Sequence, residues 1–278
     1  MGGKTRDKLR VYASQIQFDW GVENNTLIEP EQYGLAALKA VSEGYDCVKV
    51  DPISINFNGE WTASDWNIRG LLTNKILSMA YNRVKAIRQA VGPDIDIIIE
   101  LHSLTDVNIA IQLGRVLEEL NCFYYEEPVH PLNVDSMLKV AQNVRIPIAS
   151  GERIYTRWGY REFIEKRALD IIQPDIGLAG GITETKKICD MANTSDIGVQ
   201  VHICGSPIAT AAALQLEAVI PNFVIHEQHK EAVQEENIRM CKYNYQPKDG
   251  YFEIPDLPGI GQELSEEAQQ NCIKVTIK

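Results

Sequence analysis

Short runs of apolar and β-branched residues alternate along the chain with longer segments in which apolar positions recur at helical spacing. A short run followed by a helical segment, repeated many times, predicts a parallel sheet whose strands are joined by crossover helices. The predicted strands span residues 8–14, 45–51, 94–102, 121–128, 146–152, 169–175, 197–203 and 222–228. The predicted helices span about residues 29–44, 73–92, 105–121, 133–143, 156–168, 182–193 and 206–219.

Turn and cap residues mark the ends of these helices. Pro30 stands near the start of the first helix, Gly92 ends the second, and Asp106 helps to open the third. The stretch DIIIEL (96–101) is almost continuously apolar, which is typical of a sheet buried on both faces. Eight such strands in 278 residues favour a closed (β/α)7β barrel of the TIM type over an open doubly wound sheet.

The net charge bears on the partners of the chain, and its cysteines bear on its redox environment. Lys and Arg number 27 against 38 Asp and Glu, and the net charge of −11 argues against nucleic acid or an anionic membrane as a partner. The six cysteines form no CxxC pair and no cluster with histidine, which favours a reduced cytosolic protein over a disulfide scaffold. No signal peptide is recognisable and the apolar runs are too short to cross a bilayer, so we expect a cytoplasmic location.

Ionisable residues recur at the carboxyl ends of the predicted strands. Glu100, Glu126 and Glu152 close three successive strands at intervals of 26 residues, which is one strand–helix–strand repeat. All strand ends of a parallel barrel meet at one rim, where barrel enzymes hold their sites, whereas solvated surface acids would be scattered. The set at this rim comprises Lys49, Asp51, Glu100, His102, Glu126, Glu152, Asp175, His202 and Glu227.

Three carboxylates that converge from neighbouring strands need a counter-charge if all are ionised. Glu100, Glu126 and Glu152 offer only oxygen ligands, and such hard ligands suit Mg²⁺ rather than zinc. We therefore expect Glu126, the first acid of the stretch YYEEP, to be a metal ligand and Glu127 to make a structural or supporting contact.

The motifs at the strand ends resemble a known family. The series ELH, YEEP, SGER, QPDIGLAGG, VQVHICGSP and IHEQ is similar to the barrel domain of the enolase superfamily, and within it to the sugar-acid dehydratases of the mandelate racemase subgroup, such as the galactonate, gluconate and mannonate dehydratases. The resemblance runs over nearly the whole chain. It implies a (β/α)7β barrel that binds Mg²⁺ through three acids and removes the proton α to a substrate carboxylate.

The resemblance also implies a role for individual residues. It places the metal ligands on the three acids named above, the base on His202 with Asp175 as its partner, and the eighth-strand acid on Glu227. Glu227, if protonated, would donate a hydrogen bond to the developing oxyanion, and His102 would protonate the departing β-hydroxyl. The substrate-binding candidates are Lys49, Arg153 and His130.

Departures from the family pattern favour elimination of water over racemisation. Racemases of the subgroup use a second lysine on the second strand as a base, and the stretch Lys49-Val50-Asp51 lacks it. We therefore interpret the chain as a Mg²⁺-dependent dehydratase of an acid sugar, either an aldonate or an aldarate. The alternatives are a racemase or epimerase of the same superfamily, a phosphate-binding barrel, and a catalytically impaired barrel that acts as a binding module.

Residues around the expected site allow two interpretations each. Arg153 would either reach the substrate or pair with a rim acid, and His130 would either reach substrate hydroxyls or lie in an exposed loop. Trp158 opens a predicted helix, and we expect it in packing rather than in the pocket. The long aromatic loop 52–70, which includes Arg69, is expected to cover the site.

The resemblance bears on domain organisation as well. Members of the group carry an N-terminal capping domain, but here residues 1–4 lead almost at once into the first predicted strand. We expect a barrel over residues 1–240, a C-terminal extension over 241–278 and no capping domain before the barrel, so that a separate capping segment would act as a partner. The final β-like run would then expose apolar surface, and we expect a homo-oligomer.

Overall fold

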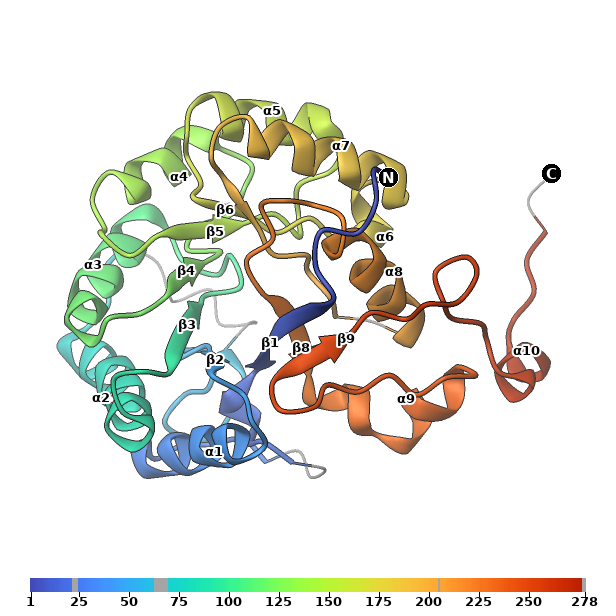
Figure 1. Cartoon of the computed structure of the whole chain (residues 1–278). Coiled ribbons are helices and arrows are strands. Elements are labelled where there is room, and N and C mark those ends of the chain that lie inside the picture. The colour runs from blue at the N-terminus through green and yellow to red at the C-terminus, as the bar shows by residue number, and fades with distance from the viewer. Residues whose placement is uncertain (22–24, 63–69, 205, 277–278) are drawn as a thin grey trace.

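The computed structural model describes residues 1–21, 25–62, 70–204 and 206–276. Eight parallel strands form a curled sheet in the order β7-β6-β5-β4-β3-β2-β1-β8, with helices around its outer side (Figure 1). The pairing of β1 with β8 brings the start of the chain beside the end of the strand series. The strands are β1 (Lys8–Ser14), β2 (Cys47–Val50), β3 (Asp96–Glu100), β4 (Tyr124–Glu126), β5 (Ile148–Ser150), β6 (Ile171–Ile172), β7 (Gly198–Val199) and β8 (His226–His229).

The crossover helices begin and end largely where the cap residues predict. Pro30 is the first residue of the first helix, the Asp106 side chain accepts hydrogen bonds from two backbone N–H groups of the third, and Gly92 ends the second at φ 80°. The helices are α1 (Pro30–Ser42), α2 (Asn74–Val91), α3 (Val107–Leu117), α4 (Val134–Ala141), α5 (Thr156–Glu165), α6 (Ile176–Ala179), α7 (Gly181–Asn193) and α8 (Pro207–Glu217).

Each predicted strand has a counterpart, but the hydrogen-bonded ladders are shorter than the apolar runs. The shortest, β6 and β7, contain two residues each. The residues that follow leave the ladder and satisfy their backbone in loops; Asp175, for example, caps α6 by accepting from the N–H of Leu178 at 3.0 Å. Several of the rim residues therefore project from loops directly after the strands.

The segment that leads into β8 lies beside β7. The N–H of Val199 donates to the carbonyl of Asn222 at 2.8 Å, and the N–H of Val224 donates to the carbonyl of Val199 at 2.8 Å. These two bonds form a parallel bridge between Val199 and Phe223. The strand series thus curls far enough for its two ends to touch.

Alternation along the strands builds two layers on the inner face of the sheet. The first layer is a buried apolar cluster made of Tyr12, Cys47, Ile98, Tyr124, Ala149, Ile171 and Ile225. The second layer lies two residues further along the same strands and consists of the buried polar side chains Ser14, Lys49, Glu100, Glu126 and Glu227. The larger apolar core packs on the other face, between strands and helices. The buried apolar cluster therefore separates the polar layer from solvent at the opposite end of the strands.

Part of the C-terminal segment pairs with the N-terminal half of β1. The strand β9 (Tyr251–Glu253) pairs antiparallel with β1, and Phe252 is buried edge-on against the His226 ring with centroids 4.9 Å apart. Gly250 turns the chain at φ 73°, where a Cβ would lie 2.3 Å from the carbonyl oxygen of Gly44. The sequence did not predict this pairing.

The rest of the C-terminal segment is more exposed. After the 3₁₀ turn η4 (Lys230–Val233) come the short helices α9 (Glu235–Met240) and α10 (Glu266–Asn271). The final β-like run forms no strand over its described residues, and Ile273 and Val275 are 93% and 79% exposed. No helix in the described part of the chain combines the length and apolar character that crossing a membrane requires.

Candidate active site

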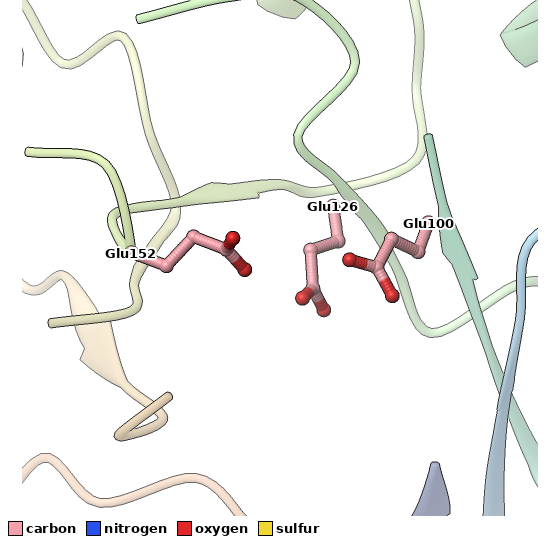
Figure 2. Close-up of side chains that lie close together, drawn as sticks. All are labelled: Glu100, Glu126 and Glu152. Carbon is pink, nitrogen blue, oxygen red and sulfur yellow. The ribbon is translucent and has the colours of Figure 1, made fainter. Parts of the chain in front are cut away.

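Glu100, Glu126 and Glu152 lie together at the carboxyl ends of β3, β4 and β5. Glu100 and Glu126 are direct neighbours in the β3–β4 ladder, and Glu152 follows the end of β5. Figure 2 shows the three side chains in a row with Glu126 between the other two. One carboxylate oxygen from each lies within 4.8 Å of the others. The repeat of 26 residues therefore brings together the acids that the sequence selected.

The donor set fits a hard divalent cation. All the candidate ligand atoms are carboxylate oxygens, and Oε2 of Glu126 is buried without a hydrogen bond from any described residue. A buried carboxylate oxygen with no partner is costly, and a cation bound by the three acids would satisfy it. Glu100, Glu126 and Glu152 are thus the residues that would hold Mg²⁺.

Lys49 supplies a buried positive charge in direct contact with two members of this set. Its Nζ atom lies 2.8 Å from Oε1 of Glu126, 3.3 Å from Oε2 of Glu100 and 2.7 Å from Oε1 of Glu227. Burial would lower the pKa of Lys49, but the three carboxylates outweigh that effect and hold the pKa well above its ordinary value. The ammonium therefore stays charged inside a layer where each of these four side chains is at most 2% exposed.

The central carboxylate is the one most affected by burial. Burial, with the charges of Glu100 and Glu227, raises the pKa of Glu126 to about 8 against the opposing attraction of Lys49. In a chain without a bound cation, burial thus favours the protonated form of Glu126. A cation at this position must displace that proton.

His202 and Asp175 form the hydrogen-bonded pair that the resemblance implies. Nδ1 of His202 lies 2.9 Å from Oδ2 of Asp175, and Nε2 lies 3.2 Å from Oε2 of Glu152. Burial opposes protonation of His202, but Asp175, Glu227 and Glu152 outweigh it and raise its pKa to about 9. With Nδ1 fixed by Asp175, the Nε2 atom is the one directed into the site.

A second His–Asp pair lies at the other end of the carboxylate row. Nδ1 of His102 lies 2.6 Å from Oδ2 of Asp51, and Nε2 lies 3.3 Å from Oε1 of Glu100. Gln15 bridges the same corner, since its Nε2 atom donates to Oε2 of Glu100 at 2.9 Å. Burial opposes protonation of His102, but Glu100 and Asp51 raise its pKa to about 9. Asp51, which the sequence placed at the rim without a role, orients this ring.

Glu227 is surrounded by hydrogen-bond donors. It accepts from Ser14 at 3.0 Å and from the N–H of Ile203 at 3.1 Å, and Nε2 of His229 lies 3.2 Å away. Burial would raise the pKa of Glu227, but Lys49 and His229 hold it well below its ordinary value. These donors favour the ionised form of Glu227, whereas donation of a hydrogen bond to an oxyanion would require its protonated form.

The remaining predicted residues differ in their relation to the site. Arg153 pairs with the rim acids Glu127 and Glu152, at 2.6 Å for the second, so the side chain that follows Glu126 makes the supporting contact expected of it. His130 is exposed, and its Nδ1 atom accepts from the N–H of Leu132 at 3.3 Å.

Trp158 does not pack as expected. It is 71% exposed, whereas the buried residues of α5 are Tyr160, Phe163 and Ile164. The expectation of packing is therefore wrong for this residue.

The loop after β2 reaches the site as far as it is described. Trp61 lies edge-on to the His102 ring with centroids 5.5 Å apart and stacks on Phe18 at 5.5 Å. The buried Arg83 of α2 anchors this loop by donating to the carbonyls of Pro52 and Ile55. Arg69 lies outside the described residues.

A cavity of about 550 Å³ opens beside His102 and Glu227. Its wall includes Trp61, His229 and Asn237. It offers room and polar groups for a small hydroxylated molecule next to the carboxylate row.

Sequence reasoning missed two contributors to the site, Gln15 and His229, and placed Asp51 at the rim without giving it a role. His229 lies two residues after Glu227, and alternation alone would have placed the two side chains on one face. Gln15 adopts a left-handed backbone at φ 66°, which no periodic pattern signals.

Comparison with known proteins adds the family. Residues 32–268 match the model of the family described as enolase C-terminal domain-like. The chain belongs to this family. A solved structure of a member of the enolase superfamily from Salmonella Typhimurium is 58% identical, with a TM-score of 0.97 over 100% of this chain and 71% of that chain. The resemblance drawn from the strand-end motifs is confirmed.

Curated relatives of this chain include proteins named as dehydratases. The D-xylonate dehydratase of Haloferax volcanii is 32% identical over 276 residues, covering 96% of this chain and 62% of that protein. The D-gluconate/D-galactonate dehydratase of Picrophilus torridus is 27% identical, covering 98% of this chain and 65% of that protein. The chain therefore spans less than two thirds of the length of these relatives.

Proposed function

We propose that the chain forms the barrel and the reacting groups of a Mg²⁺-dependent dehydratase that acts on an acid sugar of the aldonate class. The observation that carries the proposal is the carboxylate row of Glu100, Glu126 and Glu152 with an oriented histidine at each end. The names of the relatives, which refer to xylonate, gluconate and galactonate, support the substrate class.

We also propose that the curled sheet is a closed (β/α)7β barrel. The parallel bridge between Val199 and Phe223 supports closure, because it joins β7 to the segment that enters β8. The inner apolar cluster supports it as well, since its residues come from β1 to β6 and from Ile225, directly before β8. In a closed barrel the strand ends meet at one rim, as the site requires.

In this proposal neutral His202 removes the proton α to the substrate carboxylate. A cation held by Glu152 and its neighbours would offset the carboxylate charge that raises the pKa of His202. Asp175 fixes the ring through Nδ1 and stabilises the imidazolium that forms, so Nε2 accepts the proton. A Mg²⁺ ion held by Glu100, Glu126 and Glu152 would supply positive charge that stabilises the negative charge developing on the substrate as the proton leaves. Lys49, a neighbour of the same acids, adds to that positive potential.

His102 completes the elimination from the opposite end of the row. It donates a proton to the β-hydroxyl while the bond from that oxygen to the β-carbon breaks, and water leaves. The electron pair released at the α-carbon forms the new carbon–carbon double bond, and the resulting enol gives a 2-oxo acid. Asp51 holds the His102 ring through Nδ1, as Asp175 does for His202.

The second-strand residues argue against a two-base racemase. A racemase of the subgroup would need a lysine at position 51, and the Asp51 carboxylate instead orients His102. With His202 as base at one end of the carboxylate row and His102 as acid at the other, the site is suited to removing a proton and releasing a neighbouring hydroxyl as water.

The decisive test is turnover of an acid-sugar panel with and without Mg²⁺. We expect formation of a 2-oxo acid, detected with semicarbazide, from at least one aldonate, and loss of that product in chelator. Racemisation without loss of water would support the racemase alternative, and the absence of any reaction alongside tight binding would support a binding module.

A further inference from the structure

Lys49 lies within the carboxylate row rather than at its edge. Its ammonium contacts Glu126 at 2.8 Å and Glu100 at 3.3 Å, both members of the proposed metal set, and Glu227, which lies outside that set, at 2.7 Å. We propose that Lys49 is a tethered cation that competes with Mg²⁺ for Glu100 and Glu126 and thereby sets the metal affinity of the site. This inference rests on the proposed function through its metal ligands.

The competition follows from charge and space. The oxygens that would bind the metal lie within 4.8 Å of one another, and the ammonium already contacts two of the three residues that supply them. Two cations bound to the same two carboxylates, Glu100 and Glu126, would repel each other strongly in a layer whose side chains are at most 2% exposed. The Lys49 side chain is 1% exposed and its ammonium lies 5.3 Å from the centre of the Tyr12 ring, so solvent offers it no alternative position nearby.

Lys49 differs from the other cationic side chains at the site in the number of proposed metal ligands that it contacts. Arg153 contacts Glu152, His102 contacts Glu100 and His202 contacts Glu152, each a single member of the set. Each of the three pairs with one acid outside the set, as Lys49 does with Glu227. Among the described residues, only Lys49 contacts two members of the set.

Glu227 is the third carboxylate that contacts the Lys49 ammonium, and it lies outside the proposed metal set. It is the partner that Lys49 keeps when a metal takes the oxygens of Glu100 and Glu126. Neutralising Glu227 would leave the ammonium with only the metal ligands as partners, so its competition with Mg²⁺ would increase. The two residues are therefore predicted to change metal affinity in opposite directions, and Glu227 to do so through Lys49.

The test is direct measurement of Mg²⁺ binding by calorimetry, with Mn²⁺ followed by electron paramagnetic resonance as a second probe. We expect Lys49→Met to bind Mg²⁺ roughly 10-fold tighter, within the range over which groups beside the ligands tune metal affinity. Lys166→Met is the matched control, because Lys166 also contacts two carboxylates, Asp135 and Glu162, but does so on the protein surface. It should leave Mg²⁺ affinity unchanged.

Thermal unfolding gives an independent readout. Without metal, Lys49→Met should melt at a lower temperature than the wild type, because three buried acids lose their counter-ion. Saturating Mg²⁺ should raise its melting temperature by more than it raises that of the wild type. If Lys49→Met does not fold, Lys49→Gln, which keeps hydrogen-bond donors without the charge, carries the same expectation.

A double-mutant cycle tests the link to Glu227. Glu227→Gln should weaken Mg²⁺ binding in the wild-type background and leave it nearly unchanged in Lys49→Met. Equal weakening in both backgrounds would show that Glu227 acts by its own charge and would overturn the link. Unchanged or weaker binding by a folded Lys49→Met would overturn the inference while leaving the metal site of the proposed function intact. Absence of binding in every variant would overturn both.

Discussion

Glu126 is the residue on which the metal proposal depends most, since it lies between the other two acids and is 1% exposed. Replacing it by Gln keeps the shape and removes the charge. We expect Glu126→Gln to lose Mg²⁺ binding and metal-dependent turnover while retaining its circular dichroism spectrum. Glu162→Gln, at an acid 60% exposed on α5, is the control and should retain both. Wild-type metal affinity in Glu126→Gln would show that the ligands are assigned wrongly.

Exchange of the substrate α-hydrogen with solvent should distinguish the role of His102 from that of His202. Loss of a general acid or base lowers the rate by about 10²–10⁴-fold. In D₂O, His102→Asn should still exchange the α-hydrogen of a bound acid sugar without releasing water, whereas His202→Asn should do neither. Mass spectrometry of recovered substrate measures the exchange. Full exchange in His202→Asn would assign proton removal to another group.

Stability without metal should depend on pH through the same groups. His102, His202 and His229 have pKa values raised from 6.5 to about 9, because neighbouring acids outweigh the effect of burial. A group whose pKa is raised on folding stabilises the protein fully below its unfolded pKa and loses this contribution as pH rises through the folded value. In chelator, we therefore expect the melting temperature to fall between about pH 6.5 and 9.

Saturating Mg²⁺ is the control for this pH dependence. A cation on the three acids counters the charge that keeps His102 and His202 protonated, so the fall should be smaller. Scanning fluorimetry across the pH range measures both curves. A melting temperature in chelator that rises over this window would contradict the direction of the histidine shifts.

The sequence identified those site residues whose positions follow from the repeat. Glu100, Glu126 and Glu152 end successive strands, so their spacing alone placed them together. The contacts between side chains did not follow, because they depend on local backbone that no periodicity encodes. His102 at φ 49° and Glu127 at φ 44° are both in the left-handed region, where strand alternation no longer says which way a side chain points.

At the scale of elements, the order of strands and crossover helices was predicted and the ladder lengths were not. The apolar runs around β6 and β7 are longer than the two-residue ladders of these strands, because residues beyond each ladder remain buried. The pairing of β9 with β1 joins residues about 240 positions apart, and three residues of strand carry too little pattern to reveal it.

That pairing should nonetheless contribute to stability. Phe252 of β9 is 1% exposed and packs on His226, so Phe252→Ala removes a buried aromatic ring and should destabilise the fold by about 3–5 kcal/mol. Tyr251 on the same strand is 42% exposed, and Tyr251→Ala should cost about 0.5 kcal/mol or less. Urea unfolding measures both. Equal, small effects would mean that β9 frays from β1 in solution.

At the scale of the whole molecule, we expect the chain to associate with itself through its C-terminal run. Ile273 and Val275 alternate with polar residues as in a strand, yet they are 93% and 79% exposed and unpaired. An exposed amphipathic run of this kind gains free energy by pairing with a second copy. Sedimentation velocity over a range of concentrations should show association that decreases in Ile273→Ser/Val275→Ser. Leu132→Ser, at an isolated side chain 90% exposed, should leave association unchanged. Association that persists in the double variant would place the contact elsewhere on the surface, and a monomer at every concentration would refute self-association altogether.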